Sequence, residues 1–222
     1  IMAPKKARRN KAWTTKIEQP VRAPKVVSIV LLLLLFFSYW AAASHGPAAV
    51  GLWQDDAIYL CTAKSLAEGT GYRHIELPTE PLQTKYPIFY PALLALIFLV
   101  FPHYPQNLAM LQAPAALAAA ATVVLSSVYL RRVLQAPPML TVMAGVLAAA
   151  SPAILSLARF TMSDLVYGCL AVLALLALDL IQDTAVTPRR WRLWLVLCSL
   201  AIVLASWTRS IAVSLAAAAL LS

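Results

Sequence analysis

A chain of 222 residues that is 61% hydrophobic and only 12% charged has the composition of a polytopic membrane protein. Its mean hydropathy of +0.76 excludes an ordinary soluble domain of this size. The net charge of +9 is unevenly spread and is concentrated before the first apolar segment.

The N-terminal region is a basic tail. Residues 1–25 hold eight Lys or Arg side chains against Glu18 alone, and the apolar run 26–43 follows at once. By the positive-inside rule, this layout predicts a cytoplasmic N-terminus before a first span. A nucleic-acid-binding arm is the alternative, but it leaves the adjoining span unexplained, so we expect no nucleic-acid partner. The protein is expected to be integral to a membrane, the bacterial inner membrane.

Six apolar blocks define the expected topology: 26–43, 88–101, 108–130, 139–157, 165–181 and 193–222. A membrane-crossing helix needs about 20 apolar residues. Block 88–101 is too short to cross comfortably, and a crossing there would place two arginine clusters, 131–132 and 189–192, outside. We therefore predict that this block lies in the outer interface.

The predicted fold is an all-α transmembrane bundle with interfacial helices in the first external loop. Residues 1–25 form the cytoplasmic tail, 26–222 the transmembrane domain, and roughly 44–107 the external loop. The last apolar run reaches Ser222 without a terminating signal. This indicates that the sequence is the N-terminal portion of a longer protein.

An acidic pair, Asp55 and Asp56, opens a predicted amphipathic helix over 55–68 in the external loop. Carboxylates beside a membrane are costly and need a reason. One interpretation makes Asp55 the N-cap of this helix, which accounts for one carboxylate. The other makes the pair functional: one carboxylate deprotonates a nucleophile, and its neighbour orients it or a metal.

Three further charged residues each have a structural and a functional interpretation. Lys85, in KYPIFYP, either extends toward lipid headgroups or binds a lipid-linked phosphate. Asp164, in ARFTMSD, either caps a helix, pairs with Arg159, or serves as a second, orienting acid. Arg209, in SWTRS, either pairs with an acid or faces a phosphate in a cavity.

His74, Glu76 and Glu80 could join the acidic pair as ligands of a divalent metal ion, the one cofactor that the side chains suggest. Three cysteines, Cys61, Cys169 and Cys198, have no paired spacing, so neither a disulfide framework nor a cysteine metal motif is expected.

The order of these motifs is similar to that of a known family. One span, then Asp-Asp-x-x-Tyr at 55–59, SLAEGTGY, KYPIFYPALLAL, SDLVYGCLAVLALL and LASWTRS together resemble the GT-C superfamily of integral-membrane glycosyltransferases. The resembling branch holds protein O-mannosyltransferases and lipid A aminoarabinose transferases. The resemblance covers roughly 26–222.

The resemblance implies a function and site residues. Asp55 falls on the catalytic carboxylate and Asp56 on the second acidic position. Lys85 and Arg209 fall on residues that contact the donor phosphate, and Asp164 falls on the acid that opens a later span. The implied partners are membrane lipids, a polyprenol-phosphate-linked sugar, and a lipid, glycan or protein acceptor on the extracytoplasmic side.

A different class of function is compatible with the same fold. The chain could be a non-catalytic transmembrane subunit that packs in a larger membrane complex. A transporter fits less well, because the spans lack charged midplane residues and glycine-broken helices.

Overall fold

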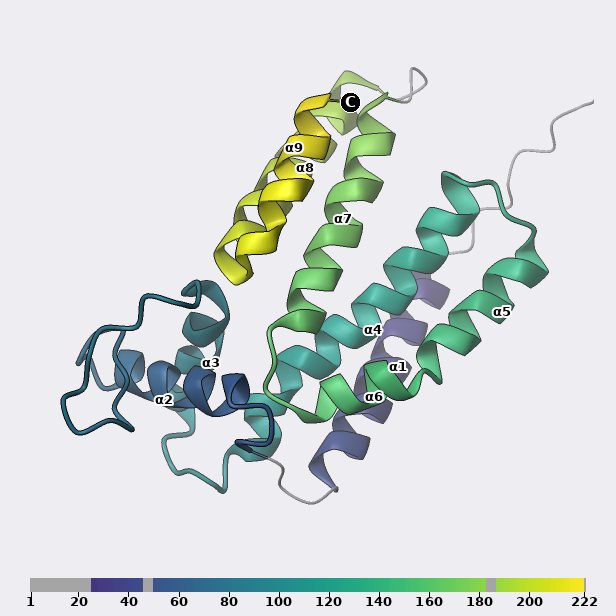
Figure 1. Cartoon of the computed structure of the whole chain (residues 1–222). Helices are drawn as coiled ribbons and strands as arrows, with labels where there is room; N and C mark the ends of the chain where they lie inside the picture. Colours follow the sequence, from purple (N-terminus) through teal and green to yellow (C-terminus); the bar gives the residue numbers. More distant parts are fainter. Residues whose placement is uncertain (1–24, 46–49, 183–186, 222) are drawn as a thin grey trace, which may run out of the picture.

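The computed structural model describes residues 25–45, 50–182 and 187–221 (Figure 1). Within these ranges the chain is helical, with one isolated β-bridge between Arg73 and Leu82 and no strand. The basic tail 1–24 lies outside the described residues. The elements in chain order are α1 (Lys25–Ser44), α2 (Asp55–Ala67), α3 (Phe89–Val100), α4 (Leu108–Arg132), α5 (Pro138–Ala149), α6 (Pro152–Arg159), α7 (Asp164–Gln182), α8 (Pro188–Thr208), the 3-10 helix η1 (Ser210–Ala212) and α9 (Val213–Leu221).

Four helices, α1, α4, α7 and α8, are long and apolar enough to cross a membrane. This confirms the helical, membrane-integral character that the composition predicts. Blocks 26–43, 108–130 and 165–181 and the first part of 193–222 coincide with these helices, although α8 begins at Pro188 rather than at 193.

The predicted third span, 139–157, is not one straight helix. It is divided into α5 and α6, which meet at an angle of 45°. Pro152 begins α6, and proline has no N–H for the carbonyl one turn back, so the helical ladder is interrupted there. The Tyr39 hydroxyl donates to the carbonyl of Ala149 at 2.9 Å. A side chain of α1 therefore satisfies a carbonyl at the break, as a protein interior without water requires.

Helix α4 is the centre of the bundle, with α1 and α7 packed along it (Figure 1). Its buried face is built from alanines, of which Ala115, Ala116, Ala119 and Ala120 have no exposed surface. Small side chains allow the helix backbones to approach closely, which is how helices associate in lipid. The Trp40 indole N–H also donates to the carbonyl of Ala109 at 2.6 Å and joins the end of α1 to the start of α4.

Residues 50–107 form a separate layer at one end of the bundle, which we call the loop end. Helices α2 and α3 pack together there, beside the start of α7 (Figure 1). Helix α3 buries Tyr90, Leu94 and Phe98 and exposes an apolar ridge at Leu96 and Leu99. Its 12 residues span about 18 Å, well short of the roughly 30 Å hydrocarbon core. The interfacial placement of α3 stays a prediction.

The C-terminal part returns to the loop end. Helix α8 ends at Thr208, and Arg209 has an extended backbone with φ −149° and ψ 137°. After η1, helix α9 runs back along α8 (Figure 1). Arg209 therefore lies in a turn between two apolar helices, close to the layer that carries the acidic pair.

Candidate functional site

The acidic pair lies at the start of α2, one residue later in the helix than predicted. Gln54 occupies the cap position with a left-handed φ of 58°, and Asp55 is the first helical residue. The prediction of Asp55 as N-cap is therefore wrong. The turn before the helix is tight: Gly51 has φ +86°, and the Asp55 N–H donates to the carbonyl of Trp53 at 2.6 Å.

Asp56 is fully buried and both of its carboxylate oxygens are occupied. Oδ2 accepts the N–H of Gly51 and Oδ1 accepts that of Ala57, each at 2.9 Å. The Thr161 hydroxyl reaches the carbonyl of Asp56 at 3.5 Å. Asp56 thus closes the turn that precedes α2 and ties it to the α6–α7 connection, a structural use of the second acid.

Asp55 is half-buried and belongs to a short polar chain with Tyr86 and Lys85. The Tyr86 hydroxyl donates a short hydrogen bond to Oδ1 of Asp55. The Lys85 ammonium donates to the same hydroxyl at 2.6 Å. Partial burial and the bond to Asp55 raise the pKa of Tyr86, and the bond to Tyr86 raises the pKa of Lys85. Lys85 therefore stays protonated and is linked to the carboxylate through a phenol.

The Lys85–Tyr86 turn is held by two residues that the sequence analysis did not single out. Gln83 is buried, and its side-chain oxygen accepts the N–H of Lys85 at 2.7 Å. The Tyr72 hydroxyl donates to the carbonyl of Tyr86 at 3.1 Å. Burial raises the pKa of Tyr72 to about 12, so this phenol remains a donor at physiological pH. The flanking prolines were the only sequence signal for a fixed turn here.

Asp164 and Arg209 form the second half of the site. Arg209 Nη1 donates to Asp164 Oδ1 in a close ion pair, and both side chains are about one third exposed, at 35% and 34%. The sequence suggested Arg159 as a partner of Asp164, but the structure pairs Asp164 with Arg209. The pair connects the start of α7 to the end of α8.

Tyr59 lies between the two halves. Its ring packs edge-on against Tyr86 at 5.2 Å and against Tyr90 at 5.3 Å between centroids. Its hydroxyl shares a hydrogen bond of 3.0 Å with Ser163, the residue before Asp164. Burial raises the pKa of Tyr59, and the charges of Arg209 and Asp55 both act on its hydroxyl. Tyr59 thus joins the Asp55–Tyr86–Lys85 chain, through its ring contact with Tyr86, to the Asp164–Arg209 pair, through Ser163. We call these charged residues, together with Tyr59, Tyr86 and Tyr90, the tyrosine cluster.

The predicted metal ligands do not assemble into a cluster. His74 Nδ1 lies 2.6 Å from Glu76 Oε1, whereas Glu80 sits in a turn with φ 42°. In the described ranges, no group of three His, Cys, Asp or Glu side chains is placed to hold a metal ion. Glu76 instead approaches Cys61, whose pKa is raised to about 11 by burial and by this carboxylate.

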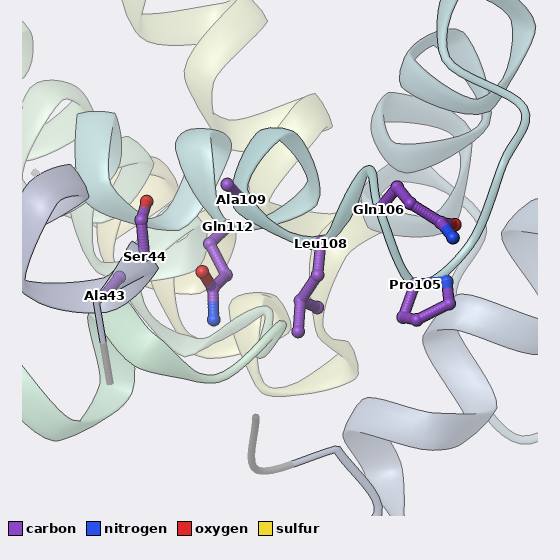
Figure 2. A pocket seen from close by; sticks show the side chains of 7 residues that line it. All are labelled: Ala43, Ser44, Pro105, Gln106, Leu108, Ala109 and Gln112. Atoms are coloured by element: carbon purple, nitrogen blue, oxygen red, sulfur yellow. The ribbon is translucent and has the colours of Figure 1, made fainter. Parts of the chain in front are cut away.

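Two cavities lie outside the tyrosine cluster. One of about 360 Å³ is on the other side of α2, where Leu60, Cys61 and Glu76 are among its walls. The second, of about 250 Å³, lies between the end of α1 and the start of α4. Ser44 and Gln112 are on one side of it and Gln106 is on the other (Figure 2). The described residues that line them include none of the four charged residues of the cluster. We place the candidate site at the cluster because charged groups from four segments converge there.

Comparison of the chain with protein-family models, with curated proteins and with solved structures gives no match. The chemistry of the site is therefore argued from its geometry. A half-buried carboxylate, an exposed ammonium and a partly exposed guanidinium at the end of an apolar bundle suit an anionic ligand that carries a nucleophile or leaving group nearby.

Proposed function

We propose that this protein is a membrane glycosyltransferase that moves a sugar from a polyprenol-phosphate donor to an acceptor on the extracytoplasmic side. One observation carries the proposal: Tyr59 connects the Asp55–Tyr86–Lys85 chain to the Asp164–Arg209 ion pair at one end of an apolar bundle. The GT-C-like order of motifs in the sequence agrees with this arrangement.

The donor's shape explains why such a site belongs at a membrane surface. A polyprenyl phosphate has its tail in the bilayer and its charge at the headgroups. Lys85 is exposed and Arg209 partly so, which leaves both able to meet a phosphate. Fixed cations stabilise the charge that develops on the leaving phosphate, so no nucleotide-binding fold is needed.

The reaction uses Asp55 as general base. The acceptor's hydroxyl or amine gives its proton to Asp55 as its lone pair forms the bond to the anomeric carbon. The bond from that carbon to the phosphate oxygen breaks, and its electron pair leaves with the polyprenyl phosphate. Tyr86 occupies Oδ1 of Asp55 and so directs the other oxygen toward the acceptor. Asp56 orients the turn, and Asp164 holds Arg209.

The proposal includes an orientation. A cytoplasmic N-terminus in a bacterial inner membrane would put the loop end, and with it the tyrosine cluster, on the extracytoplasmic face. The exposed ridge of α3 would then rest in the outer leaflet beside Lys85.

The test is transfer in proteoliposomes, followed as release of polyprenyl phosphate from a polyprenyl-phosphate sugar. Asp55→Asn is expected to lower the rate roughly 10²–10⁴-fold, because the amide has nearly the same shape but cannot accept the proton. Glu68→Gln is the matched control, since Glu68 caps the C-terminal end of the same helix in an exposed pair with Lys64. A rate for Asp55→Asn equal to that of the control would remove Asp55 from the chemistry.

A second candidate function is a non-catalytic subunit of a membrane complex. The observation that favours it is α5, all of whose residues are at least partly exposed, with Met139, Val142 and Val146 at 74%, 65% and 61%. Such a face could pack against another membrane protein. Wild-type protein that binds no polyprenyl phosphate but co-purifies with membrane partners through α5 would support this function instead.

A further inference from the structure

Two hydrogen-bonding atoms in the tyrosine cluster lack partners. The Tyr90 side chain has no exposed surface, and its hydroxyl is without a hydrogen bond in the described part of the chain. The same holds for Oδ2 of Asp164, the oxygen that Arg209 leaves free. Buried polar atoms in folded proteins are nearly always paired. A donor and an acceptor that are both unpaired in one place therefore indicate a ligand group.

The two atoms lie on segments that Tyr59 brings together. Tyr90 lies in the first turn of α3, and Asp164 is the first residue of α7. Tyr59 connects them, since its ring packs on Tyr90 at 5.3 Å and its hydroxyl bonds to Ser163, beside Asp164. The charge of Asp164 also acts on Tyr90, whose pKa is raised first by burial. Tyr90 therefore remains a protonated phenol that can donate.

The chemistry of the pair selects the ligand group. A phenol O–H must donate, and a carboxylate oxygen must accept. A hydroxyl group satisfies both at once, because it accepts from Tyr90 and donates to Asp164. An ionised phosphate oxygen could not donate to Asp164, and an ammonium could not accept from Tyr90.

We propose that Tyr90 and Asp164 form a subsite that binds a hydroxyl group of the donor sugar. This inference rests on the proposed function and adds to it the recognition of the sugar itself. In this arrangement Lys85 and Arg209 bind the phosphate. The Tyr90 hydroxyl and Oδ2 of Asp164 bind the sugar.

Arg209 bonds to the other oxygen of Asp164, Oδ1, and its side chain remains about one third exposed. The guanidinium can therefore meet a phosphate while Oδ2 of Asp164 stays available to the sugar.

The experiment compares two lipids and two conservative variants. Binding of polyprenyl-phosphate sugar and of bare polyprenyl phosphate is measured in nanodiscs for wild type, Tyr90→Phe and the control Tyr104→Phe. Tyr104 is an exposed tyrosine of the loop before α4. Loss of one hydrogen bond predicts a roughly 3- to 10-fold weaker affinity of Tyr90→Phe for the sugar-bearing lipid. The affinity for the bare lipid should stay within about twofold, and the control should match wild type.

A set of deoxy-sugar donors gives an independent readout. One deoxy donor should bind wild type and Tyr90→Phe equally, because the partner of the Tyr90 hydroxyl is then missing in both. The readout is the ratio of the affinities for the full and the deoxy donor, taken within each protein. A loss of stability in Tyr90→Phe that weakens both donors alike therefore cannot imitate it.

Other results overturn the subsite. If Tyr90→Phe binds both lipids like wild type but melts at a lower temperature, its hydroxyl holds a structural water. If wild type binds the sugar-bearing and bare lipids equally, the phosphate site stands and the sugar subsite is wrong. If wild type binds neither lipid, the proposed function fails as well.

Discussion

Two adjacent carboxylates at the start of α2 have opposite surroundings, although no local pattern distinguishes them. Asp56 is fully buried and accepts two backbone N–H groups. Asp55 is half-buried and accepts a phenol that itself contacts an ammonium. The first arrangement stabilises a turn, whereas the second leaves one carboxylate oxygen for a ligand. The pair can therefore be separated by measuring stability and activity in the same variants.

At this scale we expect Asp56→Asn to destabilise the protein. Its amide would turn an N–H₂ group toward one of the two backbone donors and leave that donor unpaired, at a cost of about 1–3 kcal/mol. Thermal unfolding in detergent measures the change, with Asp55→Asn as the neighbouring control. Equal melting temperatures for the two variants would contradict the structural role assigned to Asp56.

At the scale of elements, the break between α5 and α6 is the feature that matters most for the membrane part. A proline removes one backbone donor at the break, and Tyr39 of α1 supplies a hydroxyl to the carbonyl of Ala149. The bend is therefore fixed by a contact between helices. It lets α6 lead into the connection that carries Thr161 and Ser163, both of which bond to α2.

We expect Tyr39→Phe to lower the free energy of unfolding by about 0.6 kcal/mol, the average for hydrogen bonds between membrane helices, and by at most about 1.7 kcal/mol. Ser38→Ala is the control, because the Ser38 hydroxyl bonds only within α1, to the carbonyl of Leu34. Reversible unfolding in mixed micelles gives both values. If Tyr39→Phe lowers the free energy of unfolding no more than Ser38→Ala does, another group donates a hydrogen bond to the Ala149 carbonyl.

At the scale of the whole molecule, the topology predicts that the loop end and the α4–α5 turn lie on opposite sides of the membrane. Thr79 and Gln135 are exposed residues of these two regions. With Cys61, Cys169 and Cys198 replaced by alanine, Thr79→Cys should react with an impermeant maleimide from the periplasmic side, and Gln135→Cys only after the membrane is opened. Labelling of both from one side would refute the bundle's membrane topology.

Much of the bundle follows from the sequence, because a long apolar run has few alternatives to a membrane helix. The bend at Pro152 was missed because hydropathy counts apolar residues and ignores the missing N–H. For the site, residue types next to apolar runs led to Asp55, Lys85, Asp164 and Arg209. The sequence could not reveal their pairing, since Asp164 and Arg209 meet only when α7 and α8 pack.

The tyrosines were the larger omission. In the sequence, Tyr86 and Tyr90 read as interfacial aromatics, and Tyr59 appears only as the last residue of the Asp-Asp-x-x-Tyr motif. The role of their hydroxyls depends on the positions of Asp55, Ser163 and Asp164, which lie on other segments. Gln83 was missed for the same reason, since its role is to hold a backbone turn.

Helix α3 has one further consequence. It is a short rod that begins four residues after Lys85, carries Tyr90 on its buried side, and presents Leu96 and Leu99 on its exposed side. If that outer ridge rests in the acyl chains, the hydrocarbon thickness sets the height of the rod, and the rod sets the height of the tyrosine cluster above the lipid. Hydrophobic mismatch costs fractions of a kcal/mol per Å. The length of the lipid acyl chains would then change the position of the tyrosine cluster relative to the membrane surface.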